Sequence, residues 1–184
     1  MAKCVYCGAR GNGRVGTVMA LLMVACAVTT VQSADDVNAI NGYGKTTWGM
    51  TPDEVLKAEA PGAKRVGKPG ELGDLRSAVA VDGIQIGRDR FNAEFYFDVN
   101  HRLQLVVVRC LDGGDARADA RTFSSLEQFF TEKYGSPIRE ASGNSPRVFW
   151  KLPKTTIRLV HFNMLGTSRV NFSYEPSTAS APSR

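Results

Sequence analysis

The sequence holds few of the residues that metal sites and covalent catalysis need. Its 184 residues include only two histidines and four cysteines. A zinc site needs three or four ligands, and neither His101 nor His161 has a partner at ligand spacing. The sequence contains no Gly-x-Ser-x-Gly motif and no phosphate-binding glycine loop. It therefore predicts no catalytic residue, no metal site and no cofactor.

The chain also lacks a strong excess of one charge. The first 33 residues hold three basic residues and no acidic one, so their removal would lower the formal net charge from +5 to +2. A nucleic-acid-binding protein needs a concentrated basic surface. Here the remaining charges of both signs are interspersed, which argues against nucleic acid as a partner.

The N-terminal segment has the layout of an export signal. Lys3, Arg10 and Arg14 precede an almost wholly apolar run, residues 15–31, which closes on the small-residue sequence Val-Gln-Ser-Ala. This order is typical of a secretory signal peptide. We expect residues 1–33 to be removed and the mature protein to be periplasmic or secreted. The alternatives are an uncleaved anchor, although a spanning helix needs about 20 apolar residues, and an ordinary buried helix.

The cysteines bear on anchoring and on disulfides. The sequence Leu-Met-Val-Ala-Cys ending at Cys26 resembles a bacterial lipobox. It gives an alternative in which Cys26 carries a lipid and anchors the protein to the outer membrane, which would be its sole membrane contact. After cleavage near Ala34 only Cys110 remains, so no intrachain disulfide can form. Cys110 ends an apolar strand, and we expect it to be buried.

The rest of the chain predicts one domain over residues 46–175, after a flexible lead-in at 34–45 and before a disordered tail at 176–184. Thr51, Pro52 and Glu54 form a capping box that starts a short helix. A second helix is predicted over residues 120–134, where apolar residues recur at helical spacing.

Alternating or apolar stretches predict the strands. Residues 90–98 and 103–111 form a hairpin, and residues 147–152, 156–162 and 168–174 follow the second helix. We predict an α+β fold with two helices packed on one face of an antiparallel sheet. Residues 46–111 and 119–175 share the order of a helix followed by three strands. This predicts a tandem αβββ repeat, and the alternative is one domain whose halves are alike by chance.

Two short motifs carry a resemblance to known families. Trp-Gly-Met-Thr-Pro-Asp-Glu-Val opens the first helix, at 48–55, and Lys-Tyr-Gly-Ser-Pro ends the second, at 133–137. They resemble motifs of small exported αβββ proteins of Gram-negative bacteria, the BamE-like outer-membrane lipoproteins and the tandem β-lactamase-inhibitor proteins. The resemblance implies a protein that binds other envelope proteins and catalyses nothing. It carries over no binding residue.

The functional prediction is an exported, non-catalytic protein that binds another macromolecule in the envelope, as an assembly factor or a hydrolase inhibitor. Binding surfaces favour exposed aromatic and arginine side chains, and the candidates are Trp48, Arg88, Arg90 and Tyr96. One alternative is a carrier of a small apolar ligand or lipid, which predicts a sizeable cavity between helices and sheet. Another is a hydrolase, in which His161 or acidic residues would converge in a cleft.

Overall fold

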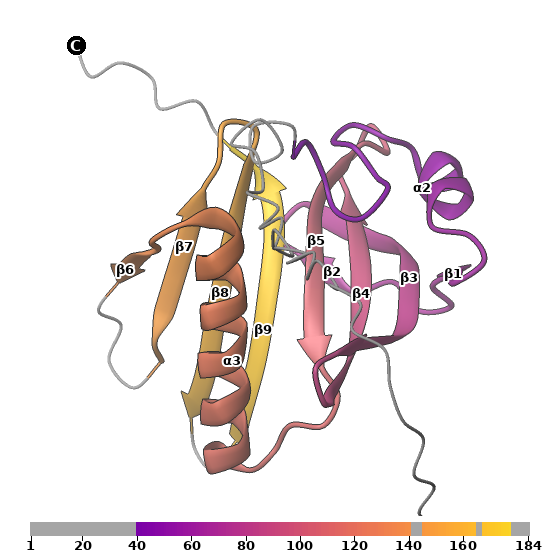
Figure 1. Ribbon diagram of the computed structural model, residues 1–184. Coiled ribbons are helices and arrows are strands. Elements are labelled where there is room, and N and C mark those ends of the chain that lie inside the picture. The colour runs from indigo at the N-terminus through magenta and orange to yellow at the C-terminus, as the bar shows by residue number, and fades with distance from the viewer. Residues whose placement is uncertain (1–39, 141–144, 165–166, 178–184) are drawn as a thin grey trace, which may run out of the picture. The chain divides into compact units, whose positions relative to one another are not determined.

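The computed structural model describes residues 40–140, 145–164 and 167–177 (Figure 1). These residues belong to one compact unit, residues 32–184. The predicted signal peptide, Cys26 within it and residues 178–184 of the predicted tail lie outside the described residues.

One antiparallel sheet dominates the described part of the chain. Its nine strands are β1 (Ala63–Arg65), β2 (Glu71–Leu72), β3 (Leu75–Ile86), β4 (Asp89–Phe97), β5 (Leu103–Cys110), β6 (Ile138–Glu140), β7 (Arg147–Lys151), β8 (Thr155–Met164) and β9 (Thr167–Pro176). The strand order is β1-β3-β4-β5-β9-β8-β7-β6, with β2 paired to β3 off this path. Strands β5 and β9 therefore join the earlier and later parts of the chain in the middle of the sheet.

Helix α2 (Pro52–Ala58) begins at the predicted capping box. The Thr51 side chain accepts a hydrogen bond from the Glu54 backbone N–H, and the Glu54 carboxylate accepts one from the Thr51 backbone N–H. That backbone hydrogen bond holds the pKa of Glu54 below its usual value. The helix has seven residues, and Val55 is its one buried residue. Helix α2 therefore adds little to the core.

Helix α3 (Ala116–Tyr134) starts four residues before the predicted position. Asp115 caps it by accepting a hydrogen bond from the Ala118 N–H at 2.7 Å. The helix packs on β7, β8 and β9 and lies in front of these strands in Figure 1. The Phe130 ring lies 5.3 Å from the Trp150 ring and 5.2 Å from the Phe172 ring, centroid to centroid. This long helix covers the later half of the sheet.

The predicted fold class is corrected by these proportions. Within the described residues the molecule is mostly sheet, with one helix of 19 residues and one of seven, and α2 is followed by five strands and α3 by four, in place of three each. The additional strands β1, β2 and β6 are two or three residues long and largely exposed. They have no apolar alternation, and two of them lie within residues 63–77, a basic and glycine-rich stretch in which the sequence predicts no strand.

The helices share a single core with one face of the sheet. A row of cross-strand neighbours runs through it from β3 to β7: Val79, Phe95, Val106, Tyr174, Ile157 and Trp150. All six are at most 8% exposed. The segment before α2 joins this core, because Tyr43 and Trp48 pack against it. No helix in the described ranges is long and apolar enough to cross a membrane.

Candidate functional site

The face of the sheet opposite the core carries charged and polar side chains. We call it the open face, and define it by the outward residues of β4, β5, β7, β8 and β9: Asn92, Glu94, Val107, Arg109, Arg147, Phe149, Lys151, Arg158, Val160, Phe162, Arg169, Asn171, Ser173 and Glu175. They follow the pairing register, since Glu94, Val107, Ser173, Arg158 and Phe149 are successive cross-strand neighbours. Period-two alternation places this row opposite the core.

A connected polar network crosses β4 and β5 on the open face. Arg109 forms an ion pair with Glu94 at 2.8 Å. The Tyr96 hydroxyl donates to Glu94 at 2.7 Å and accepts from Arg109 at 2.8 Å. Burial alone would raise the pKa of Glu94, but the hydrogen bonds from Arg109 and Tyr96 outweigh it and hold the pKa below its usual value. Glu94 is therefore a stable carboxylate that fixes the Arg109 guanidinium in place.

A second ion pair lies further along the same face. Arg158 contacts Glu175 at 3.1 Å, and its guanidinium lies 5.1 Å from the centre of the Phe149 ring. The Nε atoms of Arg147 and Arg158 and the Asn92 Oδ1 atom are buried without a hydrogen-bond partner among the described residues. Buried polar atoms are normally paired, and these three lie beneath the surface of the open face.

The four predicted binding residues lie in separate places. Arg88 and Arg90 are exposed at the β3–β4 turn, and Arg90 is held by Asp112 through its backbone N–H and its guanidinium. Trp48 lies on the core side, where its Nε1 donates to the Lys154 carbonyl and the Thr155 hydroxyl. The structure does not bring these residues together, and their role in binding stays a prediction.

Tyr96, the fourth candidate, is only 1% exposed. The segment after β1 covers it. The Gly70 N–H donates to the Ser77 hydroxyl at 2.7 Å, and a side chain at Gly70 would meet the Tyr96 hydroxyl at 3.2 Å. Tyr96 therefore acts on the surface through Glu94 and Arg109, which it orients.

The open-face arginines were missed because the sequence was interpreted strand by strand. Arg109 lies in the largely apolar stretch 103–111, which predicts a strand and gives no sign of a polar surface. Arg147 begins β7, and Arg158 alternates with buried residues in β8, as any outward-facing side chain of a strand does. Arg109 and Arg147 lie in one cross-strand row, joined through Asn171 and Val160, and Arg158 lies in the next row of the same face. This arrangement depends on the strand order, which the sequence alone does not give.

The histidines and Cys110 occupy separate, structurally explained positions. His101 has a φ of 56° in the β4–β5 turn. His161 is buried, with its Nε2 2.9 Å from the Ser168 hydroxyl. Cys110 is 4% exposed, and burial raises the pKa of its thiol. The described residues contain no cluster of three histidine, cysteine or acidic side chains that could hold a metal ion.

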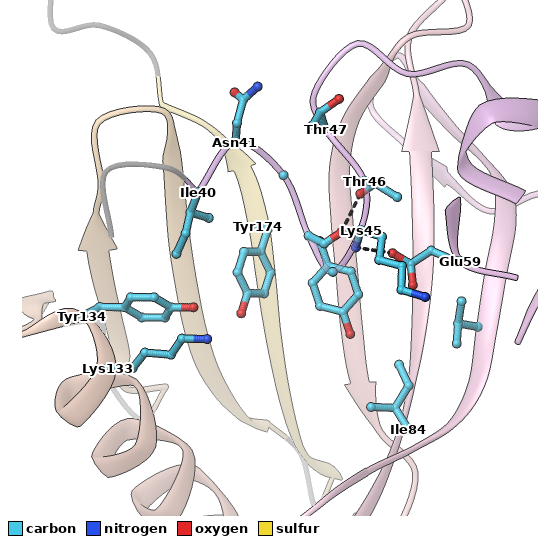
Figure 2. Close-up of a pocket in the computed structure, with 14 residues that line it drawn as sticks. Ile40, Asn41, Lys45, Thr46, Thr47, Glu59, Ile84, Lys133, Tyr134 and Tyr174 are labelled. Carbon is cyan, nitrogen blue, oxygen red and sulfur yellow. Dashed lines mark hydrogen bonds between the residues drawn. The ribbon is translucent and has the colours of Figure 1, made fainter. Parts of the chain in front are cut away.

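Two cavities lie on the helix-covered side. The first, about 630 Å³, is lined by the segment before α2, by Glu59, and by Tyr134 and Tyr174 (Figure 2). Burial and the Glu59 charge raise the pKa of Tyr43, which lines it, to about 12. Burial likewise raises the pKa of Tyr174 well above its usual value. These phenols therefore stay protonated and can act as hydrogen-bond donors.

The second cavity, about 840 Å³, lies between α3 and the β3–β4 turn. Its lining combines apolar side chains with three arginines, Arg88, Arg117 and Arg121. It is separate in lining residues from the cavity in Figure 2.

Comparison with known proteins identifies no relative of this chain. The chain matches no protein-family model, and no curated protein or solved structure is significantly similar to it.

Proposed function

We propose that this chain is an exported, non-catalytic protein of the cell envelope, periplasmic or secreted, that binds another protein through the open face of its sheet. The N-terminal signal layout supports export. The ordered polar surface on the open face supports binding.

The observation that carries the proposal is the pair of open-face arginines that carboxylates hold in place, Arg109 by Glu94 and Arg158 by Glu175. An arginine whose guanidinium is held in place loses little side-chain entropy when it binds, and arginine is enriched among residues that dominate interface energies. Because the Arg158 side chain is 43% exposed, a partner that accepts hydrogen bonds can reach its guanidinium from this face.

The charges on the open face point to an acidic partner. Arg147, Lys151 and Arg169 have no carboxylate within ion-pair distance among the described residues, whereas Arg109 and Arg158 have one each. Unpaired arginine and lysine favour complementary carboxylates and raise the association rate. Phe162, 40% exposed, offers an apolar contact on the same face.

The test is a cross-linked pull-down of the tagged protein from cell envelopes, with the mature N-terminus of the bait determined by mass spectrometry. The double variant Lys151→Glu/Arg169→Glu reverses two exposed charges of the open face. The matched control is Lys57→Glu/Lys68→Glu, which reverses two exposed lysines elsewhere. We expect wild type and control to capture one stoichiometric protein and the open-face variant to lose it.

Equal capture by both double variants would exclude the open face as the docking surface. A bait whose N-terminus still begins at Met1 would contradict export by signal cleavage. An N-terminus at Cys26 with an added lipid mass would instead establish the lipoprotein form.

A further inference from the structure

The cavity between α3 and the β3–β4 turn has two chemically distinct parts. Ile86, Phe91, Leu126 and Phe129 give it an apolar lining. Arg88 from the β3–β4 turn and Arg117 and Arg121 from α3 line it as well. A volume of about 840 Å³ lies within the range of small-ligand sites.

The helix arranges these residues by polarity. Arg117, Arg121, Ser125 and Phe129 all line the cavity and recur every four residues, so they lie along one side of α3. At 1.5 Å per residue this row is about 18 Å long. It runs from two arginines at the helix start to Phe129, which is 47% exposed. The cavity is therefore cationic at one end and apolar at the other.

The three arginines are uncompensated. Arg88, Arg117 and Arg121 form no ion pair with the described residues, and the two acids of the cavity are already engaged. Asp112 is bound to Arg90 at 2.6 Å, and Asp89 accepts a hydrogen bond from the Thr122 hydroxyl at 2.8 Å. In addition, Arg117 lies in the first turn of α3, where the helix dipole disfavours a positive charge.

We propose that this cavity binds a single-chain amphiphile with an anionic carboxylate or phosphate head. The head would lie among Arg88, Arg117 and Arg121, whose planar guanidinium groups suit both anions. The alkyl chain would lie over Phe129, which is 47% exposed, and remove its apolar surface from water. This site is lined by other residues than the open face, so it does not rest on the proposed docking function.

The cavity in Figure 2 does not share this charge pattern. There Lys133 approaches from α3, while the Glu59 carboxylate lines the other side. Glu59 also accepts a hydrogen bond from the Lys45 backbone N–H at 2.7 Å. Because that lining holds lysines and no arginine, it lacks the planar guanidinium groups that bind a carboxylate or phosphate through two hydrogen bonds. The inference is therefore confined to the arginine-lined cavity.

Isothermal titration calorimetry of the full chain tests the proposal, with decanoate and decyl phosphate below their micelle concentrations. We expect saturable binding at a 1:1 ratio. The variant Arg117→Gln/Arg121→Gln should weaken it by about tenfold or more, because hydrogen bonds to charged groups are the stronger ones. The charge-matched control Lys57→Gln/Lys68→Gln should bind as wild type does.

Two further measurements distinguish the contribution of the ligand's anionic head from that of its alkyl chain. Phe129→Ser changes a half-exposed side chain and should weaken decyl phosphate binding while the protein stays folded. Inorganic phosphate should bind much more weakly than decyl phosphate, and preference between decanoate and decyl phosphate identifies the head group. No saturable binding of either amphiphile, equal weakening in the lysine control, or inorganic phosphate binding as tightly as decyl phosphate would overturn the proposal.

Discussion

The two faces of the sheet differ in the polarity and burial of the side chains that the same strands place on them. On the core face, cross-strand neighbours such as Phe95 and Val106 are fully buried apolar side chains. On the open face, the adjoining positions hold Glu94 and Arg109, which form an ion pair while their side chains stay 24% and 33% exposed. Alternation along each strand therefore separates a surface that stabilises the fold from a surface that orders polar groups.

This division gives the two faces different energetic consequences. Burial of apolar area is the main favourable term in folding, so substitutions on the core face should cost several kcal/mol. Partly exposed ion pairs contribute little to stability. Open-face substitutions should therefore change binding far more than they change folding.

The sharpest test of the core face is Phe130→Ala. Phe130 is 2% exposed and contacts the rings of Trp150 and Phe172. Its truncation leaves a cavity between α3 and the sheet and should lower the free energy of unfolding by about 3–5 kcal/mol. Chemical denaturation, monitored by circular dichroism, measures this change in the free energy of unfolding.

The neighbouring Phe129→Ala provides the control, since Phe129 is 47% exposed. It should lower the free energy of unfolding by less than about 1 kcal/mol, in line with other surface substitutions. Similar losses for the two variants would mean that α3 does not pack on the sheet through Phe130.

On the open face, Glu94→Gln should lower the free energy of unfolding by about 1 kcal/mol at neutral pH, because it weakens the pairing with Arg109. The pKa of Glu94 is lowered in the folded state, so its stabilisation is present above the ordinary carboxyl pKa and is lost as the pH falls through the lowered one. The difference between variant and wild type should therefore shrink in acid.

Denaturation curves at a series of pH values, from neutral down to below the lowered pKa of Glu94, would measure the difference in unfolding free energy between wild type and Glu94→Gln. A gap between Glu94→Gln and wild type that stays constant across the series would show that the Glu94 charge contributes nothing through Arg109.

The sequence predicted those features whose signal is local. The capping box at Thr51 and Glu54 needs only four residues, and the alternation of Phe91, Ala93 and Phe95 marks a half-buried strand. Strands β1, β2 and β6 were missed because they are short, exposed and stabilised by pairing with distant partners. The burial of Tyr96 under the segment at Gly70 could not be predicted, since no local pattern says which loop covers a strand.

The candidate sites could not be predicted for the same reason, because their residues come together only in the folded chain. Arg109, Arg147 and Arg158 become one surface only through the order β4-β5-β9-β8-β7. Arg88 meets Arg117 and Arg121 only because α3 passes beside the β3–β4 turn. Arginines scattered along a sequence of low net charge give no local signal, and the fold concentrates them.

The smallest expected effect concerns the cap of the short helix α2, with the cap of α3 as its comparison. Thr51→Ala removes the capping box of α2 and should lower the free energy of unfolding by about 0.5–1 kcal/mol, since α2 buries only Val55 and can fray without opening the core. Asp115→Ala removes the cap of α3, which is anchored by three buried apolar residues, and should cost about 1 kcal/mol or slightly more. Hydrogen exchange should then show faster exchange confined to α2 in Thr51→Ala. Faster exchange spreading into β4 and β5 would mean that α2 stabilises the core face more than its single buried residue indicates.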